Sequence, residues 1–115
     1  MLNSTSQLLI VEKYEKLINY LYPILQSMPR THGVAKNLVL NDLLITPSMM
    51  IVAGKIGQVS KLYLIDAQLA TVRYWMRFLV DRKCMTKHQE QTAQVLMAEV
   101  GAILGSWISS KKKQG

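Results

Sequence analysis

The sequence has a single cysteine, Cys84, among its 115 residues. A disulfide needs two thiols, so none can form within the chain, and this cysteine usage suits a reducing compartment. The first six residues also lack the basic-then-apolar order of a signal peptide. We therefore expect a cytoplasmic protein.

Long apolar runs are missing as well. A membrane-spanning helix needs about 18 or more consecutive apolar residues. A charged residue interrupts every stretch that comes near this length. We expect a soluble protein with no membrane partner.

Residues suited to catalysis are scarce. The only two histidines, His32 and His88, are far apart and have no second histidine or cysteine at metal-ligand spacing. The sequence contains no glycine-rich phosphate loop, nucleophile elbow or H-E-x-x-H motif. We therefore expect no enzymatic activity, no metal site and no cofactor.

Acidic residues are half as frequent as basic ones. The 7 aspartates and glutamates stand against 14 lysines and arginines, which gives a net charge of +7. Such an excess attracts polyanions, although it specifies no fold. Half of the residues are hydrophobic, which suits a folded domain rather than a disordered chain.

The hydrophobic residues repeat at helical spacing in four segments. The first segment, about residues 4–28, opens with Ser4 and Gln7 at capping-box spacing and contains Pro23, where we expect a kink. The second begins after a turn at residues 28–33, contains Pro47, and is predicted to end near Gly54. Their predicted core stripes are Ile10, Tyr14, Leu17, Leu21 and Ile24 in the first segment, and Val34, Leu38, Ile45, Met49 and Val52 in the second.

The third and fourth segments have the clearer periodicity. Thr86 and Gln89 form a second capping-box pair, which predicts where the fourth helix starts. The predicted core stripes are Leu62, Ile65, Leu69, Val72, Met76 and Leu79 in the third segment, and Ala93, Leu96, Val100, Ile103 and Trp107 in the fourth.

Four long helices with short connections predict an all-α protein, an up-down-up-down four-helix bundle forming a single domain over residues 1–115. The basic tail, residues 109–115, is predicted to be disordered.

Aromatic residues gather on the third helix opposite its core stripe. They are Tyr63, Tyr74, Trp75 and Phe78. One interpretation is a wide core with some aromatics half exposed. The preferred interpretation is a subunit interface, because aromatics are enriched at interface cores. Gly101 and Gly105 would let another backbone approach the fourth helix closely, although packing within the subunit explains that spacing equally well.

Arg73 and Arg77 stand four residues apart at the edge of the third helix's core stripe. They could pair with Asp66, Asp81 or Glu99 and orient the bundle, or they could line a groove and bind phosphate. The residues leave these alternatives open. The full set of candidate nucleic-acid or polymerase contacts is Arg73, Arg77, Arg30, Lys36, Lys55, Lys61, Arg82 and Lys83.

The chain resembles the accessory variability determinant (Avd) family of diversity-generating retroelements, including the phage-borne type. The resemblance runs from about Leu9 to Ile108, and it rests on the order and spacing of several motifs rather than on any single one. These motifs are Leu9–Glu15, Leu21–Ile24, Pro29–Ala35, Ile51–Lys55, Gln58–Tyr63, Val72–Leu79 and Ala98–Ile108.

The resemblance implies a four-helix protomer that assembles into a ring-like homopentamer. It implies binding to the retroelement's reverse transcriptase and template-region RNA. It leaves open whether complementary DNA is also bound. It also implies a role in mutagenic retrohoming, in which complementary DNA synthesis is error-prone at template adenines. The resemblance also implies a functionally important basic surface, and Arg73 and Arg77 lie on the helix that matches it. Proteins encoded in ribosomal-RNA intervening sequences share the bundle, so a structural or interaction module with no polymerase partner is the alternative.

Overall fold

The computed structural model describes residues 2–114, and all of its long elements are helices. They are α1 (Leu2–Gln26), α2 (Gly33–Ile56), α3 (Val59–Asp81) and α4 (Lys87–Gln114), with a short 3-10 helix, η1 (Arg30–His32), before α2. No strand occurs among the described residues. The all-α fold predicted from the sequence is confirmed.

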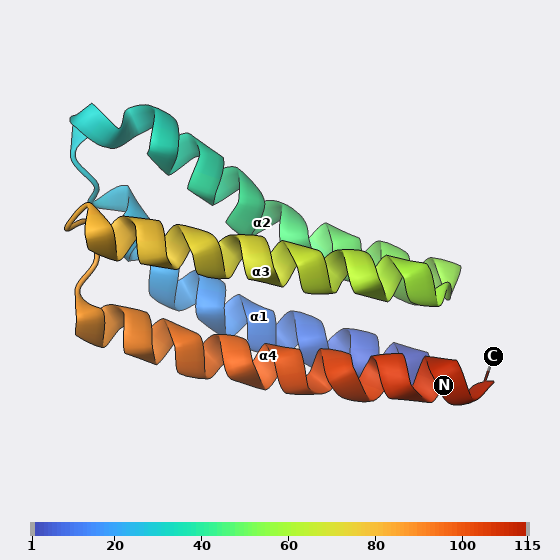
Figure 1. The fold of residues 1–115 in the computed structure, drawn as a ribbon. Helices are drawn as coiled ribbons and strands as arrows, with labels where there is room; N and C mark the ends of the chain where they lie inside the picture. The colour runs from blue at the N-terminus through green and yellow to red at the C-terminus, as the bar shows by residue number, and fades with distance from the viewer. Residues whose placement is uncertain (1, 115) are drawn as a thin grey trace.

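The four helices form one elongated bundle of 48 × 24 × 18 Å. Helix α1 packs against α2 and α4, and α3 packs against the same two helices. Consecutive helices run in opposite directions (Figure 1). The arrangement is the predicted up-down-up-down bundle, and it places η1 and the α3–α4 connection at one end.

Helix α3 follows its predicted core stripe without exception. All six predicted residues, from Leu62 to Leu79, are at most 2% exposed. In α1 the first four predicted residues are buried, and Leu25 is buried in preference to Ile24. In α4, Met97 and Leu104 are buried where Leu96 and Ile103 were predicted, and the latter two pack half-buried against the core.

The predicted core stripe of α2 is wrong. Four of its five residues are exposed, from 45% for Val52 to 78% for Val34, and Met49 is half-buried. The residues that α2 buries are Val39, Leu43, Thr46, Met50 and Ala53. Two apolar stripes on one helix give the same periodicity, so spacing alone does not say which one faces the core.

The polar residue in the α2 core face is Thr46, which is 0% exposed. Its hydroxyl donates a 2.8 Å hydrogen bond to the carbonyl oxygen of Asp42, one turn earlier. A buried hydroxyl with a partner costs little, which allows threonine to occupy this position.

The apolarity of α2 has a further consequence. By length and composition, the stretch Arg30–Ile56 resembles a membrane-spanning helix. In the bundle, however, α2 packs against α1 and α3 and supplies five buried residues to the shared core. Its remaining apolar residues form a second, outward stripe.

Both internal prolines lie inside continuous helices. Pro47 has no N–H to bond the carbonyl of Leu43, four residues earlier. The hydroxyl of Tyr14, from α1, donates to that carbonyl oxygen at 2.8 Å instead. At Pro23, α1 continues to Gln26, and the backbone N–H and hydroxyl of Ser27 both donate to the Pro23 carbonyl.

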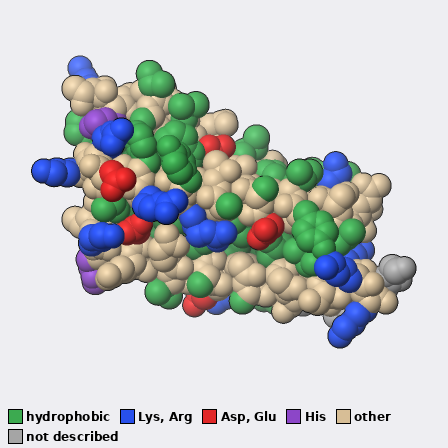
Figure 2. All heavy atoms as spheres, in the orientation of Figure 1, with side chains coloured by type: hydrophobic (Ala, Val, Ile, Leu, Met, Phe, Trp, Pro, Cys, Tyr) green, Lys and Arg blue, Asp and Glu red, His purple; other side chains and the backbone are tan. Residues whose placement is uncertain are grey.

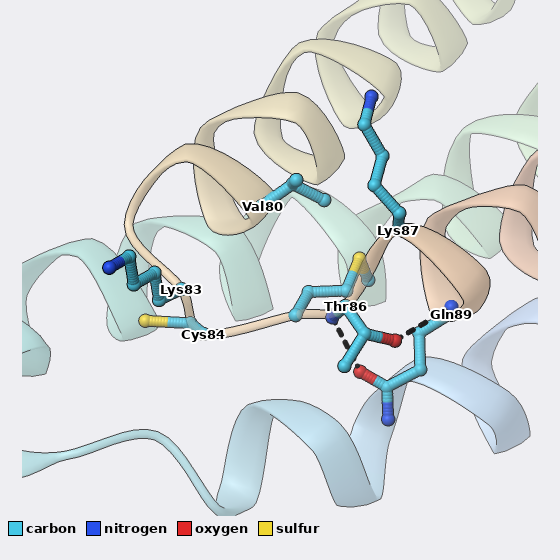
Figure 3. A pocket seen from close by; sticks show the side chains of 7 residues that line it. Val80, Lys83, Cys84, Thr86, Lys87 and Gln89 are labelled. Carbon is cyan, nitrogen blue, oxygen red and sulfur yellow. Dashed lines mark hydrogen bonds between the residues drawn. The ribbon is translucent and has the colours of Figure 1, made fainter.

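The predicted capping box at the start of α4 is confirmed. The Thr86 N–H donates to Gln89 Oε1 at 2.9 Å, and the Gln89 N–H donates to Thr86 Oγ1 at 3.0 Å (Figure 3). The Ser4 side chain, predicted to cap the first helix, lies outside the described side chains, and α1 begins earlier, at Leu2.

Two predicted helix ends are displaced. Helix α2 extends past Gly54 to Ile56, and Gly57 ends it with a left-handed φ of 79°. Gly54 lies inside the helix, where a Cβ atom would collide with the Gln7 side chain. Helix α4 continues to Gln114, so the structure has helix at 109–114, where the sequence predicted a disordered tail.

Candidate nucleic-acid and partner interface

Arg73 and Arg77 lie one helical turn apart on α3 and line the same surface hollow. Ala70 and Tyr74 of α3 complete one side, and Gln94 of α4 lies on the other. The hollow, about 350 Å³ in volume, therefore lies between α3 and α4. Figure 2 shows lysine and arginine side chains along this side of the bundle.

Neither arginine forms an ion pair with another described residue. In the described part of the chain, no carboxylate oxygen lies within the 4.0 Å ion-pair limit of Arg73 or Arg77. Glu99, one of the predicted partners, instead lies 3.6 Å from Lys13 of α1. The sequence left two alternatives open, an ion pair within the bundle and a groove. Among the described residues, the two arginines line a groove and form no ion pair.

The Tyr74 side chain is 53% exposed at this hollow. Its ring contacts Trp75 edge to face, with centroids 5.4 Å apart and planes at 67°. The Trp75 indole N–H in turn donates a 2.7 Å hydrogen bond to Asp42 Oδ2 on α2. Gln68 donates to the Asp42 carbonyl at 2.9 Å, so the α2–α3 seam is tied at one aspartate.

Trp75 and Phe78 pack within the protomer, contrary to their predicted place on a side facing away from it. Both are half-buried against the core, and their rings meet edge to face at 5.3 Å. The Arg82 guanidinium carbon lies 4.7 Å from the Phe78 ring centroid. Of the four predicted interface aromatics, only Tyr63 and Tyr74 are exposed.

The remaining basic residues do not form one patch. Arg30, Lys36, Arg82 and Lys83 belong to the end of the bundle with η1 and the α3–α4 connection. Lys55 and Lys61 belong to the opposite end, where α2 passes into α3. The long axis of the molecule is 48 Å, so these two groups cannot contact the same short ligand.

Lysines of the α4 C-terminus join Lys55 and Lys61 at that opposite end. Lys111 Nζ lies close to Gly57, and Lys112 Nζ lies 5.7 Å from the ring centroid of Tyr63. Hydrogen bonding to Tyr63 and, second, the electrostatic interaction with its ionisable side chain raise the pKa of Lys112. This grouping could not be predicted from the sequence, because the lysine-rich tail was expected to be disordered.

Lys83 owes its position to the end of α3. It adopts a left-handed conformation with φ of 60°. Its N–H donates to the Val80 carbonyl, and the next N–H, of Cys84, donates to the Leu79 carbonyl. This is the Schellman pattern that closes helices. Figure 3 shows Lys83, Cys84 and Lys87 around the neighbouring hollow.

The outward stripe of α2 is a second candidate contact surface. Val34, Leu38, Ile45, Val52 and Ile56 recur at spacings of four and seven, and each is at least 45% exposed. Beside this outer stripe, Ile45, Met49, Val52 and Leu64 line a mainly apolar hollow. Contiguous apolar surface of this kind marks interaction sites in soluble proteins.

Gly101 and Gly105 of α4 face open space. A Cβ at Gly101 or Gly105 would meet nothing within 4 Å, so these glycines are not explained by close packing within the protomer.

Among the described residues, no three His, Cys, Asp or Glu side chains gather closely enough to hold a metal ion.

Comparison with known proteins identifies the family. A family model described as bAvd-like matches residues 8–111, which is nearly the whole chain. No curated protein matches the chain. The matched region includes α2, α3, most of α1 and α4, and the Arg73–Arg77 hollow, and it confirms the resemblance to accessory variability determinants. The chain belongs to the bAvd-like family.

Proposed function

We propose that this protein is a non-catalytic, cytoplasmic accessory protein of a diversity-generating retroelement, binding the element's reverse transcriptase and its template-region RNA. In this role it is needed for adenine-mutagenic complementary DNA synthesis and retrohoming, and complementary DNA is a further candidate ligand. Polymerase chemistry belongs to the partner. The observation that carries the proposal is the hollow in which Arg73 and Arg77 have no carboxylate partner within the described part of the chain.

Two guanidinium groups that form no ion pair with any described residue suit phosphate. Arginine presents a planar fork of donors that binds phosphate oxygens in pairs, and its charge persists at any physiological pH. The protein's net charge of +7 adds a long-range attraction for polyanions. In this proposal the chain of phosphates runs along the α3–α4 seam at the hollow.

We also propose that the protein works as a ring-like homopentamer. The outer stripe of α2 supports assembly, because a lone bundle leaves this apolar surface in water. A cyclic ring joins two different faces of each copy. Helix α2, with its second apolar side, supports this proposal better than α3, whose Trp75 and Phe78 are half-buried within the protomer.

The proposal is tested with Arg73→Ala, Arg77→Ala and the double variant, using thermal melts, RNA titrations at several salt concentrations and pull-down of the reverse transcriptase. Each lost phosphate contact should flatten the slope of log affinity against log salt by about 0.7–0.9. Melting temperatures should stay near wild type, because no ion pair is broken.

Lys16→Ala is the matched control, since this exposed α1 lysine makes no ion pair among the described residues. It should retain polymerase and RNA binding. Large drops in melting temperature for the arginine variants, with RNA and polymerase binding intact, would refute the proposal. That result would favour the alternative of a structural module of the ribosomal-RNA intervening-sequence type.

A further inference from the structure

The arginine hollow contains an aromatic ring that phosphate binding does not require. Tyr74 lines it together with Arg73, Arg77 and Gln94, and its side chain is 53% exposed. A tyrosine exposed on a helix surface is unremarkable alone. Here it shares the hollow with two cations that have no carboxylate partner among the described residues, and with an amide that can both donate and accept hydrogen bonds.

The Tyr74 ring is supported by a neighbouring ring. Its edge-to-face contact with Trp75, at 5.4 Å and 67°, leaves at least one face of the phenol ring uncovered by the indole. Trp75 is itself fixed by its 2.7 Å hydrogen bond to Asp42 of the neighbouring helix. A ring held this way loses little freedom when a flat ligand stacks on it, so binding costs less conformational entropy.

We infer that this hollow binds a single-stranded stretch of RNA, with phosphates on Arg73 and Arg77 and an unpaired base stacked on Tyr74. The inference rests on the proposed function and specifies its substrate class. In a duplex, each base face is covered by its neighbours, so a tyrosine face has nothing to stack on. Aromatic platforms beside a positively charged groove are the usual way in which proteins hold single strands.

The arrangement also indicates how selective the site is. Stacking tolerates any base, because every base has a π face. The Gln94 carboxamide is the one uncharged hydrogen-bonding side chain in the hollow besides the Tyr74 hydroxyl. It can contact a base edge as donor or acceptor. The site therefore distinguishes single strand from duplex more strongly than it distinguishes sequences.

The test measures binding of a fluorescently labelled RNA, alone and annealed to its complement, at one fixed salt concentration. The protein variants are wild type, Tyr74→Leu and Tyr74→Phe, with Tyr22→Leu as control because Tyr22 is a 41% exposed tyrosine on α1. Wild type should prefer the single strand. Tyr74→Leu should weaken single-strand binding by about 5- to 140-fold, the equivalent of one stacked base.

The other variants separate stacking from alternatives. Tyr74→Phe keeps the ring and should bind the single strand like wild type, as should Tyr22→Leu, and duplex affinity should be unchanged in all of them. Equal wild-type affinity for the two RNA forms, a comparison that needs no variant, overturns the inference. So does undiminished single-strand binding by a folded Tyr74→Leu protein.

These failures are distinguishable from failure of the proposed function. If Arg73→Ala and Arg77→Ala weaken RNA binding while Tyr74→Leu does not, RNA binding at the hollow stands and stacking is refuted. If wild type binds neither RNA form, the proposed RNA binding fails and the inference fails with it.

Discussion

The hydroxyl of Tyr14 in α1 donates a 2.8 Å hydrogen bond to the carbonyl oxygen of Leu43 in α2. That carbonyl is the acceptor left without a helical donor by Pro47, four residues later. The tyrosine is 0% exposed, so the bond lies in the core. One side chain thus ties two helices together and supplies the donor that the proline lacks.

We expect Tyr14→Phe to lower the free energy of unfolding by about 1–3 kcal/mol, because a buried carbonyl loses its partner. In a Pro47→Ala background, the residue at 47 has an N–H that can bond the Leu43 carbonyl. Tyr14→Phe should then cost less. Urea unfolding of the wild type, both single variants and the double variant measures this coupling. An equal cost of Tyr14→Phe in both backgrounds would contradict it.

Stability should depend on Tyr14 at alkaline pH. Burial, chiefly, raises the pKa of this phenol, and the nearby Asp42 raises it further, while a hydrogen bond with Thr46 lowers it. The unfolded chain releases this proton near pH 10, whereas the folded chain retains it. The stabilisation is therefore full below about pH 10 and is lost as the pH rises above it, by up to about 1.4 kcal/mol per pH unit.

The measurement is chemical unfolding of wild type and Tyr14→Phe between about pH 8 and pH 11. The difference between the two should shrink above about pH 10, since phenylalanine has no proton to lose. Comparing the two proteins cancels the titration of lysines and of the other tyrosines. A constant difference across this range would show that Tyr14 ionises as easily when folded as when unfolded.

Trp75→Phe should destabilise the protomer by about 1.5–3 kcal/mol, because it removes a hydrogen bond to the charged Asp42 carboxylate. Trp75 is only half-buried, so we expect the lower part of this range. Tyr74→Phe is the control that keeps both rings and the Asp42 bond. Circular dichroism melts and sedimentation separate folding from assembly. Dissociation of the oligomer at unchanged stability would indicate instead that Trp75 lies in the subunit interface.

Ile45→Lys should disrupt the proposed ring while leaving helix content unchanged. Ile45 is 46% exposed in the outer stripe of α2, so a charge there meets water in the free protomer but a neighbour in the ring. Leu44→Lys is the matched control, adjacent in sequence, 45% exposed and off the stripe. Light scattering reports the mass. Wild type that is monomeric at micromolar concentration, or Ile45→Lys that still assembles, would refute the prediction.

The core of α3 could be predicted from sequence because its buried apolar residues recur at an unbroken spacing of three and four positions from Leu62 to Leu79. In α2 the stripe that faces the core includes Thr46 and Ala53. Hydrophobicity alone ranks these two residues low, so it favours the outward stripe instead. The tail was mispredicted because its lysines and serines were taken as a sign of disorder. No proline or glycine interrupts 106–114, and α4 continues through them.

The candidate site was only partly predictable. Helical spacing placed Arg73 and Arg77 on one face, but their freedom from ion pairs depends on contacts between helices. Glu99 is paired with Lys13 of α1, a relationship that no local pattern contains. The hydrogen bond from Trp75 to Asp42 likewise joins residues 33 positions apart. Such contacts follow from the register of packed helices.

Most helix contacts in the bundle join helices that are neighbours in sequence, and this affects how fast the chain can fold. Three of the four packed helix pairs are consecutive in sequence, and only α1 and α4 join distant segments. Local contacts require little loop closure, so two helical hairpins can form early and independently, within the microsecond-to-millisecond range of helical bundles. We expect the α1–α4 pair, which the Lys13–Glu99 contact links, to close last, because it joins the segments farthest apart in sequence.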